Sequence, residues 1–160
     1  MDEKFGYWLA GLIDGEGHFA IRRLSRHSFP TLRFEITMRV DDAPMLEMIR
    51  DTLGFGQIYT RKSGHTNPQG YKSKRMVSFV VWNKTDTKNL ANLLRQFPLR
   101  SKKQRDFLLW AEAADLWYST DFVGWKTRWG INPVKAQAIG RLEELAIEII
   151  KVRKCNSDCD

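Results

Sequence analysis

The sequence lacks long apolar runs and contains few cysteines. No stretch approaches the roughly 20 consecutive apolar residues that a transmembrane helix requires, so no membrane partner is expected. The first residues have neither the basic start nor the apolar centre of a signal peptide, which predicts an intracellular protein, in a bacterial cytoplasm or an organelle, that is not secreted. Cys155 and Cys159 stand in a polar tail far from the three histidines. Two reduced thiols explain them better than a zinc site, which needs four ligands.

The sequence also lacks linker-like and low-complexity stretches. Residues 1–160 are therefore expected to form a single domain, and a hydrophobic fraction of 42% with 6 Trp is enough for a packed core. Acidic residues are the minority, because 19 Asp and Glu stand against 26 Lys and Arg, a net charge of +7. This balance favours a polyanionic partner, of which nucleic acid is the commonest, although an ordinary basic enzyme would have a similar charge.

Hydrophobic periodicity predicts the fold class. Residues 32–40 are apolar at every even position and polar at every odd one, which is typical of a strand with one buried face. Further strands are expected at 18–22, 57–62 and 75–82. Helices are expected at 5–13, 42–53, 85–97, 101–118 and from 132 onward. The result is an α+β fold, αββαββα, with a four-stranded antiparallel sheet over about 4–118 and additional C-terminal helices over about 119–154.

The end of the first predicted helix has an unusual composition. Residues 9–17 read Leu-Ala-Gly-Leu-Ile-Asp-Gly-Glu-Gly, and the small residues Ala10 and Gly11 would let another helix backbone approach closely. Glu16 stands at the helix C-terminus, where the macrodipole disfavours an anion, and a hard cation such as Mg²⁺ would compensate it. Taken alone, the segment is better explained as a glycine-rich helix end with a solvated glutamate.

Residues 9–17 resemble the LAGLIDADG motif of homing endonucleases and depart from it at two positions, where Gly15 replaces Ala and Glu16 replaces Asp. With the order of helices and strands, the resemblance extends to about residue 118, and the last forty residues add little to it. The chain is similar to the single-motif, homodimeric members of this family. The resemblance implies an intron-encoded endonuclease that cuts both strands of double-stranded DNA at a long pseudo-palindromic site and leaves 3′ overhangs.

The resemblance also implies roles for the motif residues. Glu16, with Gly15 beside it, is expected to form the metal site, which would take Mg²⁺, with Mn²⁺ or Ca²⁺ as substitutes in binding. One chain carries one motif, so a second carboxylate has to come from a second chain in a homodimer. The motif residues expected at the dimer interface are Leu9, Ala10, Gly11, Ile13 and Asp14.

Two further positions are candidates for catalysis. Lys102 and Lys103 fall in the first turn of a predicted helix, where positive charge is unfavourable, and similar family members use a basic residue near this place to assist the reaction. The alignment prefers Lys102 but permits Lys103, and two solvated lysines are the alternative. Asp42 falls where relatives often carry a glutamine near the active centre, and it is equally well explained as a helix N-cap.

Polar positions on the predicted strands are candidates for reading base edges in the major groove. Arg suits guanine, Gln suits adenine and Glu suits cytosine, and this face favours Arg, Gln and Tyr over the Lys, Glu and Thr of an ordinary solvated sheet. The candidates are His18, Arg22, Arg26, Arg33, Glu35, Thr37, Arg39, Gln57, Tyr59, Arg61, Lys74 and Ser78. The aromatic residues between 110 and 129 are expected mostly to pack the C-terminal helices against the back of the sheet rather than to stack on bases.

Two other functions fit the same motif. An intron maturase would use the fold to assist RNA splicing, with RNA as its partner, and a regulator would bind DNA without cutting it. The acid Glu16 argues against a pure regulator, which has no need of it, but it does not discriminate against a maturase that also cleaves.

Overall fold

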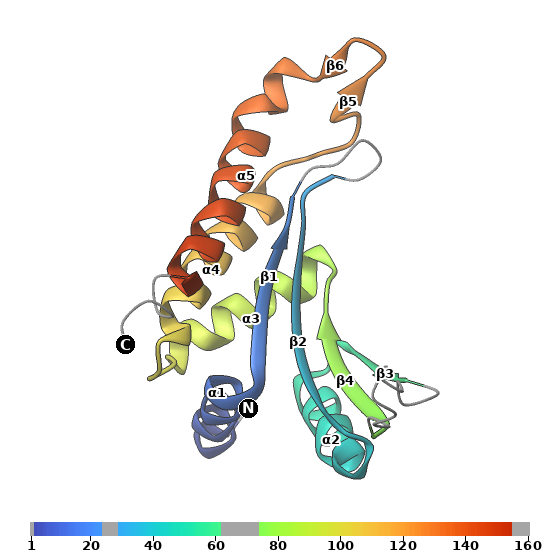
Figure 1. Ribbon diagram of the computed structural model, residues 1–160, viewed down its shortest axis with the longest axis vertical. Coiled ribbons are helices and arrows are strands. Elements are labelled where there is room, and N and C mark those ends of the chain that lie inside the picture. Colours follow the sequence, from blue (N-terminus) through green and yellow to red (C-terminus); the bar gives the residue numbers. More distant parts are fainter. Residues whose placement is uncertain (1, 24–28, 62–73, 155–160) are drawn as a thin grey trace, which may run out of the picture.

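The computed structural model describes residues 2–23, 29–61 and 74–154, and it confirms the α+β class (Figure 1). In chain order the elements are α1 (Glu3–Glu16), β1 (Gly17–Arg22), β2 (Thr31–Arg39), η1 (Val40–Asp42), α2 (Ala43–Leu53), β3 (Gln57–Thr60), β4 (Met76–Val81), α3 (Lys84–Gln96), α4 (Lys103–Ser119), β5 (Lys126–Thr127), β6 (Gly130–Ile131) and α5 (Pro133–Lys154). No helix in these ranges is long and apolar enough to cross a membrane.

The four main strands form one antiparallel sheet in the order β1-β2-β4-β3. The register pairs His18 with Glu35 and Thr37 with Ser78, and Ser78 also pairs with Tyr59 on the other side of β4. Because residues directly opposite each other in paired strands point to the same face, the polar positions of all four strands share one side of the sheet. The predicted division of the strands into an apolar and a polar face is therefore confirmed.

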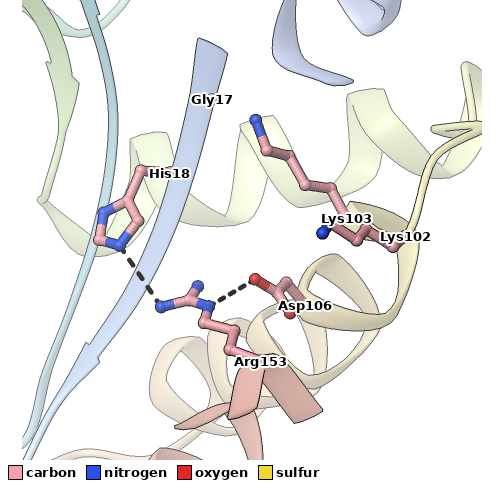
Figure 2. Close-up of a pocket in the computed structure, with 6 residues that line it drawn as sticks. All are labelled: Gly17, His18, Lys102, Lys103, Asp106 and Arg153. Carbon is pink, nitrogen blue, oxygen red and sulfur yellow. Dashed lines mark hydrogen bonds and ion pairs between the residues drawn. The ribbon is translucent and has the colours of Figure 1, made fainter. Parts of the chain in front are cut away.

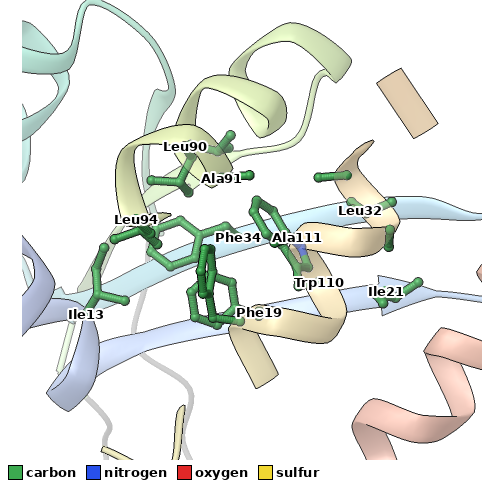
Figure 3. Packing of buried hydrophobic residues seen from close by; sticks show 14 of the residues in the cluster. Ile13, Phe19, Ile21, Leu32, Phe34, Leu90, Ala91, Leu94, Trp110 and Ala111 are labelled. Atoms are coloured by element: carbon green, nitrogen blue, oxygen red, sulfur yellow. The ribbon is translucent and has the colours of Figure 1, made fainter. Parts of the chain in front are cut away.

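The apolar face of the sheet carries the core, as Figure 3 shows. Phe34 is fully buried in the middle of β2, and the ring centroid of Phe19 on β1 lies 5.0 Å from it. Trp110 of α4 completes this aromatic group, with its centroid 5.3 Å from Phe19. Leu90 and Leu94 of α3 pack on the same cluster. Helices α3 and α4 therefore cover one face of the sheet and leave the polar face open.

Two helix boundaries differ from the predicted ones because distant or unexpected side chains cap them. Helix α1 was expected to end at Ile13 but continues to Glu16, since Lys103 donates to carbonyls of its last turn. Helix α3 begins at Lys84, one residue before the predicted start, because Asn83 caps it with an Oδ1 that accepts the N–H of Asp86 at 2.8 Å.

Residues 101–104 have the Ser-x-x-Gln sequence of a capping box at the start of α4, but they do not form one. The Oγ of Ser101 accepts the N–H of Lys103 at 3.1 Å, and the N–H of Gln104 donates to the backbone carbonyl of Ser101. Gln104, however, accepts the N–H of Leu99 and not that of Ser101, because the Ser101 N–H donates to the carboxylate of Asp14. The capping box is thus replaced by a contact between α1 and the segment before α4.

The predicted C-terminal helix is present as α5, and it packs against α4 and β1. Its apolar stripe is buried as expected, at Ile139, Leu142, Leu145, Ala146 and Ile149. The expected packing of the C-terminal aromatics holds for Trp110 and Phe122, whereas Tyr118 and Trp129 are 50% and 83% exposed. Helix α5 is therefore part of the same core rather than a separate appendage.

Candidate active site

The carboxylate of Asp14 fastens the end of α1 to the segment that joins α3 to α4. It accepts the N–H of Arg100 at 2.7 Å, and it accepts both the N–H and the hydroxyl of Ser101, at 3.1 and 2.7 Å. Burial opposes the charge of Asp14, but these hydrogen bonds and the nearby Lys103 outweigh it and hold the pKa of this carboxyl below its usual value. Asp14 therefore links the end of α1 to a segment of the same chain that lies 86 residues further along the sequence.

Lys103 caps the C-terminus of α1. Its ammonium donates to the carbonyls of Ile13 and Gly15 at 3.2 and 2.7 Å, so it satisfies acceptors that a helix end leaves without partners. Burial lowers the pKa of Lys103, and the carboxylates of Glu16 and Asp14 act in the opposite direction. Of the two candidate lysines, Lys103 thus binds α1, whereas the side chain of Lys102 is exposed and its ammonium has no polar partner among the described residues.

Glu16 is the last residue of α1, and its side chain is exposed. An exposed carboxylate at this place is a suitable oxygen ligand for a hard divalent cation. Within the described part of the chain, no three Asp, Glu, His or Cys residues come together in a way that could hold a metal ion. Glu16 would therefore share such an ion with ligands from outside the described residues, such as phosphate oxygens or a second chain.

The Gly15 carbonyl is the available oxygen of the residue beside Glu16, and it accepts the Lys103 ammonium at 2.7 Å. A carbonyl oxygen has two lone pairs, so this bond leaves one acceptor position. The expected place of Gly15 in the metal site stays a prediction.

The exposed face of α1 differs from the predicted dimer interface. Leu9, Ala10 and Ile13 are 1%, 4% and 0% exposed because they pack into the chain's own core, so their side chains cannot contact a second chain. Of the predicted interface residues, Gly11 is exposed, and a Cβ built there would meet nothing within 4 Å. The same holds for Gly15, one turn further along the helix. The exposed face therefore centres on these two glycines.

Aromatic side chains flank the two glycines. Trp8 is three residues before Gly11 and so lies on the same side of α1, and it is 41% exposed. Tyr7 is 50% exposed. The face therefore combines a bare backbone with large apolar side chains. The sequence did not separate the two sides of this helix, because α1 is apolar nearly all round.

A pocket of about 220 Å³ lies between β1, the start of α4 and the end of α5. Figure 2 shows the residues that line it, which are Gly17, His18, Lys102, Lys103, Asp106 and Arg153. It brings together three predicted site residues, His18 and the two lysines. Sequence reasoning missed Asp106 and Arg153, although Arg153 follows Ile149 by four residues and so continues the buried stripe of α5.

The predicted base-reading residues are arranged as expected where the structure describes them. His18, Arg22, Arg33, Glu35, Thr37, Arg39, Gln57, Tyr59 and Ser78 occupy the polar face through the registers of β1 to β4. Arg61 follows β3 and donates its N–H to Met76, while Lys74 is exposed just before β4. Arg26 lies outside the described residues. This face therefore presents a two-dimensional array of polar side chains.

Neighbouring polar side chains on this face bind one another. Arg33 donates to Glu35 at 3.0 Å, and the hydroxyls of Thr37 and Ser78 are 2.7 Å apart. Such pairing holds each donor and acceptor in a defined direction, as base recognition requires.

Asp42 occupies the N-cap position of α2, but its side chain makes no capping hydrogen bond. It is also not among the described residues that line the pocket beside α1. Its catalytic role stays a prediction.

The sequence of the chain matches that of a known protein family. A family model described as LAGLIDADG endonuclease matches residues 9–114, which is more than half of the chain. The chain therefore belongs to the LAGLIDADG endonuclease family.

Two curated relatives show the range of this similarity. The chain is 30% identical over 113 residues to the probable intron-encoded endonuclease Cox1-I1b of Schizosaccharomyces pombe, a match that covers 69% of this chain and 27% of that protein. It is 43% identical over 51 residues to the intron-encoded RNA maturase bI4 of Saccharomyces cerevisiae, which covers 32% of this chain and 7% of that protein. The match thus spans 27% or less of the length of these relatives.

Solved structures share the fold. The LAGLIDADG meganuclease I-AabMI bound to uncleaved DNA aligns with a TM-score of 0.62 at 25% identity, over 86% of this chain and 43% of that one. The archaeal intron-encoded homing endonuclease I-Vdi141I complexed with DNA aligns with a TM-score of 0.69 at 24% identity, over 94% of this chain and 86% of that one. The predicted fold is thereby confirmed.

Proposed function

We propose that this protein is a metal-dependent, site-specific DNA endonuclease that works as a homodimer. The observation that carries the proposal is the exposed carboxylate of Glu16, held at the end of α1 by Asp14 and Lys103 at the edge of a basic, polar sheet. Family membership supports the reaction class, because the matching model is described as an endonuclease.

The geometry assigns separate tasks to the residues of the site. Glu16 would hold Mg²⁺ together with phosphate oxygens and the same carboxylate of a second chain. When bound, the ion supplies Lewis-acid polarisation of the phosphoryl group. Lys103 keeps the helix end that carries Glu16 in place. Lys102 retains a free ammonium in the adjoining pocket, where it can stabilise negative charge that develops on the phosphate.

The polar face of the sheet provides the sequence specificity in this proposal. The face of a β-sheet can lie along the major groove of DNA, and the side chains of this one include the donors and acceptors that base edges recognise. Arg33 and Gln57 are suited to guanine and adenine, respectively. Two such faces related by a two-fold axis would read a pseudo-palindromic site, with the cut at its centre. Cutting on both strands at offset positions would leave 3′ overhangs.

The exposed face of α1 is suited to bring the two copies together. Gly11 and Gly15 would let the two helix backbones approach closely, and Trp8 would be buried beside them. This packing would also place the Glu16 carboxylates of both chains near the same axis, because each follows Gly15 directly. Formation of the dimer through this face would therefore also assemble the active site.

Gly11→Leu is expected to convert the homodimer into a folded monomer. The chain itself has room for the new side chain, since a Cβ at Gly11 meets nothing within 4 Å, but a close helix pair does not. Sedimentation velocity measures the mass, and circular dichroism reports the fold. Gly140→Leu is a matched control, because Gly140 is an exposed glycine of α5 with equal room. A Gly11→Leu variant that stays dimeric would place the interface elsewhere.

Cleavage of a partly randomised palindromic DNA library tests the proposed function. Purified protein with Mg²⁺ is expected to cut a small subset of the library, and sequencing of the ends should return one symmetric site with 3′ overhangs. The same reaction in EDTA is expected to give no cuts. Cutting that is unaffected by EDTA would contradict the metal requirement, and cutting without sequence preference would contradict the role of the sheet.

Maturase function is the second candidate, because the chain resembles the Saccharomyces cerevisiae maturase over 51 residues at 43% identity. The same library experiment separates the two functions. Selective binding of DNA without cleavage, in both Mg²⁺ and Mn²⁺, would favour a maturase or a regulator that binds DNA without cutting it. Binding and splicing of a cognate intron RNA would then be the property to measure.

A further inference from the structure

The pocket beside Glu16 has the charge of a site for an anion. Its charged lining comprises three cations, from Lys102, Lys103 and Arg153, and one carboxylate, from Asp106. A concave site lined by one excess sign of charge concentrates ions of the opposite sign. The pocket also opens at the first turn of α4, where helix N–H groups add partial positive charge. Its volume of about 220 Å³ leaves room for a phosphate group.

Arg153 is held in a fixed position in this pocket. Its Nε donates to Asp106 at 2.6 Å, and its Nη2 donates to the backbone carbonyl of Phe19. Its Nη1 lies 3.4 Å from the Nε2 of His18, and Figure 2 marks this contact with a dashed line. A guanidinium has five N–H donors, so two remain for a ligand. Asp106 is only 13% exposed, which means that the anchor of the guanidinium is itself largely removed from solvent.

We propose that this pocket binds one phosphate group of the DNA backbone, and that Arg153 makes α5 part of the DNA-binding site. The inference rests on the proposed function, because it takes the duplex to lie on the polar face of the sheet, where His18 stands beside the pocket. Arg153 lies beyond residues 9–114, to which the family model is matched. The contact assigns to the C-terminal helix a role in binding as well as in packing.

The salt dependence of binding to an unselected duplex tests the inference. Arg153→Gln is compared with Lys151→Gln, which removes the same charge two positions away, about 160° around the helix from Arg153. Affinity for a fluorescent duplex of about 30 base pairs is measured in EDTA from about 50 to 200 mM NaCl. Arg153→Gln is expected to reduce the slope of log affinity against log salt by about 0.9 per chain, the effect of one lost phosphate contact. Lys151→Gln should reduce it by less than half as much.

A second measurement needs neither DNA nor a variant. NMR spectra of the wild-type chain are followed at one pH and constant ionic strength as inorganic phosphate is added. The backbone amide signals of the pocket residues His18, Lys103 and Arg153 are expected to shift together and to saturate, whereas that of Lys151 should stay in place. Unmoved pocket signals, or equal salt slopes for Arg153→Gln and Lys151→Gln, would overturn the inference. Wild-type protein that binds no duplex at all would instead overturn the proposed function, and with it the assignment of the phosphate to DNA.

Discussion

Glu16→Gln is expected to reduce DNA cleavage by about 10³-fold or more. The substitution keeps the size of the side chain and removes the charge that would hold the metal. Transition-state stabilisation by a bound metal is worth several kcal/mol, and each 1.36 kcal/mol changes a rate tenfold. Affinity for the target should stay within about tenfold, because the polar face of the sheet is unaltered. Single-turnover cleavage and filter binding in Ca²⁺ measure the two quantities separately.

Two companion variants make the Glu16 experiment specific. Glu16→Asp keeps a carboxylate and restores the residue of the LAGLIDADG motif, so it should retain a substantial part of the activity. Glu3→Gln removes the same charge from the opposite end of α1 and should cut like the wild-type protein. Normal cleavage by Glu16→Gln would show that another group holds the metal.

Asp14→Ala is expected to destabilise the protein by about 2–3 kcal/mol, which corresponds to a fall in Tm of roughly 5–10 °C. The carboxylate accepts three hydrogen bonds from Arg100 and Ser101, and bonds to a charged acceptor are among the stronger ones. Their loss would release the end of α1 from the segment before α4. Because Glu16 is carried on that end, cleavage should fall as well. Urea unfolding at pH 7 measures the change in stability.

The pH dependence of the destabilisation by Asp14→Ala tests whether the charge of Asp14 causes it. The folded-state pKa of Asp14 lies below its unfolded value, so its contribution is present above about pH 4 and is lost as pH falls through the folded pKa. The difference between wild type and Asp14→Ala should therefore shrink at low pH. Asp51→Ala removes an exposed carboxylate of α2 as a control and should cost little at either pH. A difference that is the same at pH 7 and pH 3 would mean that the charge of Asp14 is not what stabilises this contact.

Local patterns were sufficient for the strands. In β2 the alternation of apolar and polar residues is a property of a single strand, and burying the apolar set at Leu32, Phe34 and Ile36 leaves one arrangement of the two faces. The same reasoning placed Thr37 and Ser78 on one face before their pairing was known, and the two hydroxyls lie 2.7 Å apart. Helix α5 was equally predictable, because its apolar stripe is continuous.

Helix α1 shows where local patterns fail. Both its sides carry apolar residues, so periodicity gave no reason to bury Leu9 and Ile13 rather than Trp8. The choice follows from how α1 packs on the sheet, which depends on residues far along the chain. Three residues of the interface predicted from the motif, Leu9, Ala10 and Ile13, are therefore buried in the chain's own core, whereas Gly11 lies at the centre of the exposed face.

The sequence by itself determined the fold class, the position of the acid Glu16 at a helix end, and the polar face of the sheet, because each depends on residues close together in the chain. Tertiary structure alone decided that Lys103, rather than Lys102, reaches the carbonyls of α1. It also decided that Arg153 joins His18 across 135 residues of sequence. Neighbouring residues on a helix point about 100° apart, so which of them faces a site is set by how whole helices pack, and no local pattern contains that information.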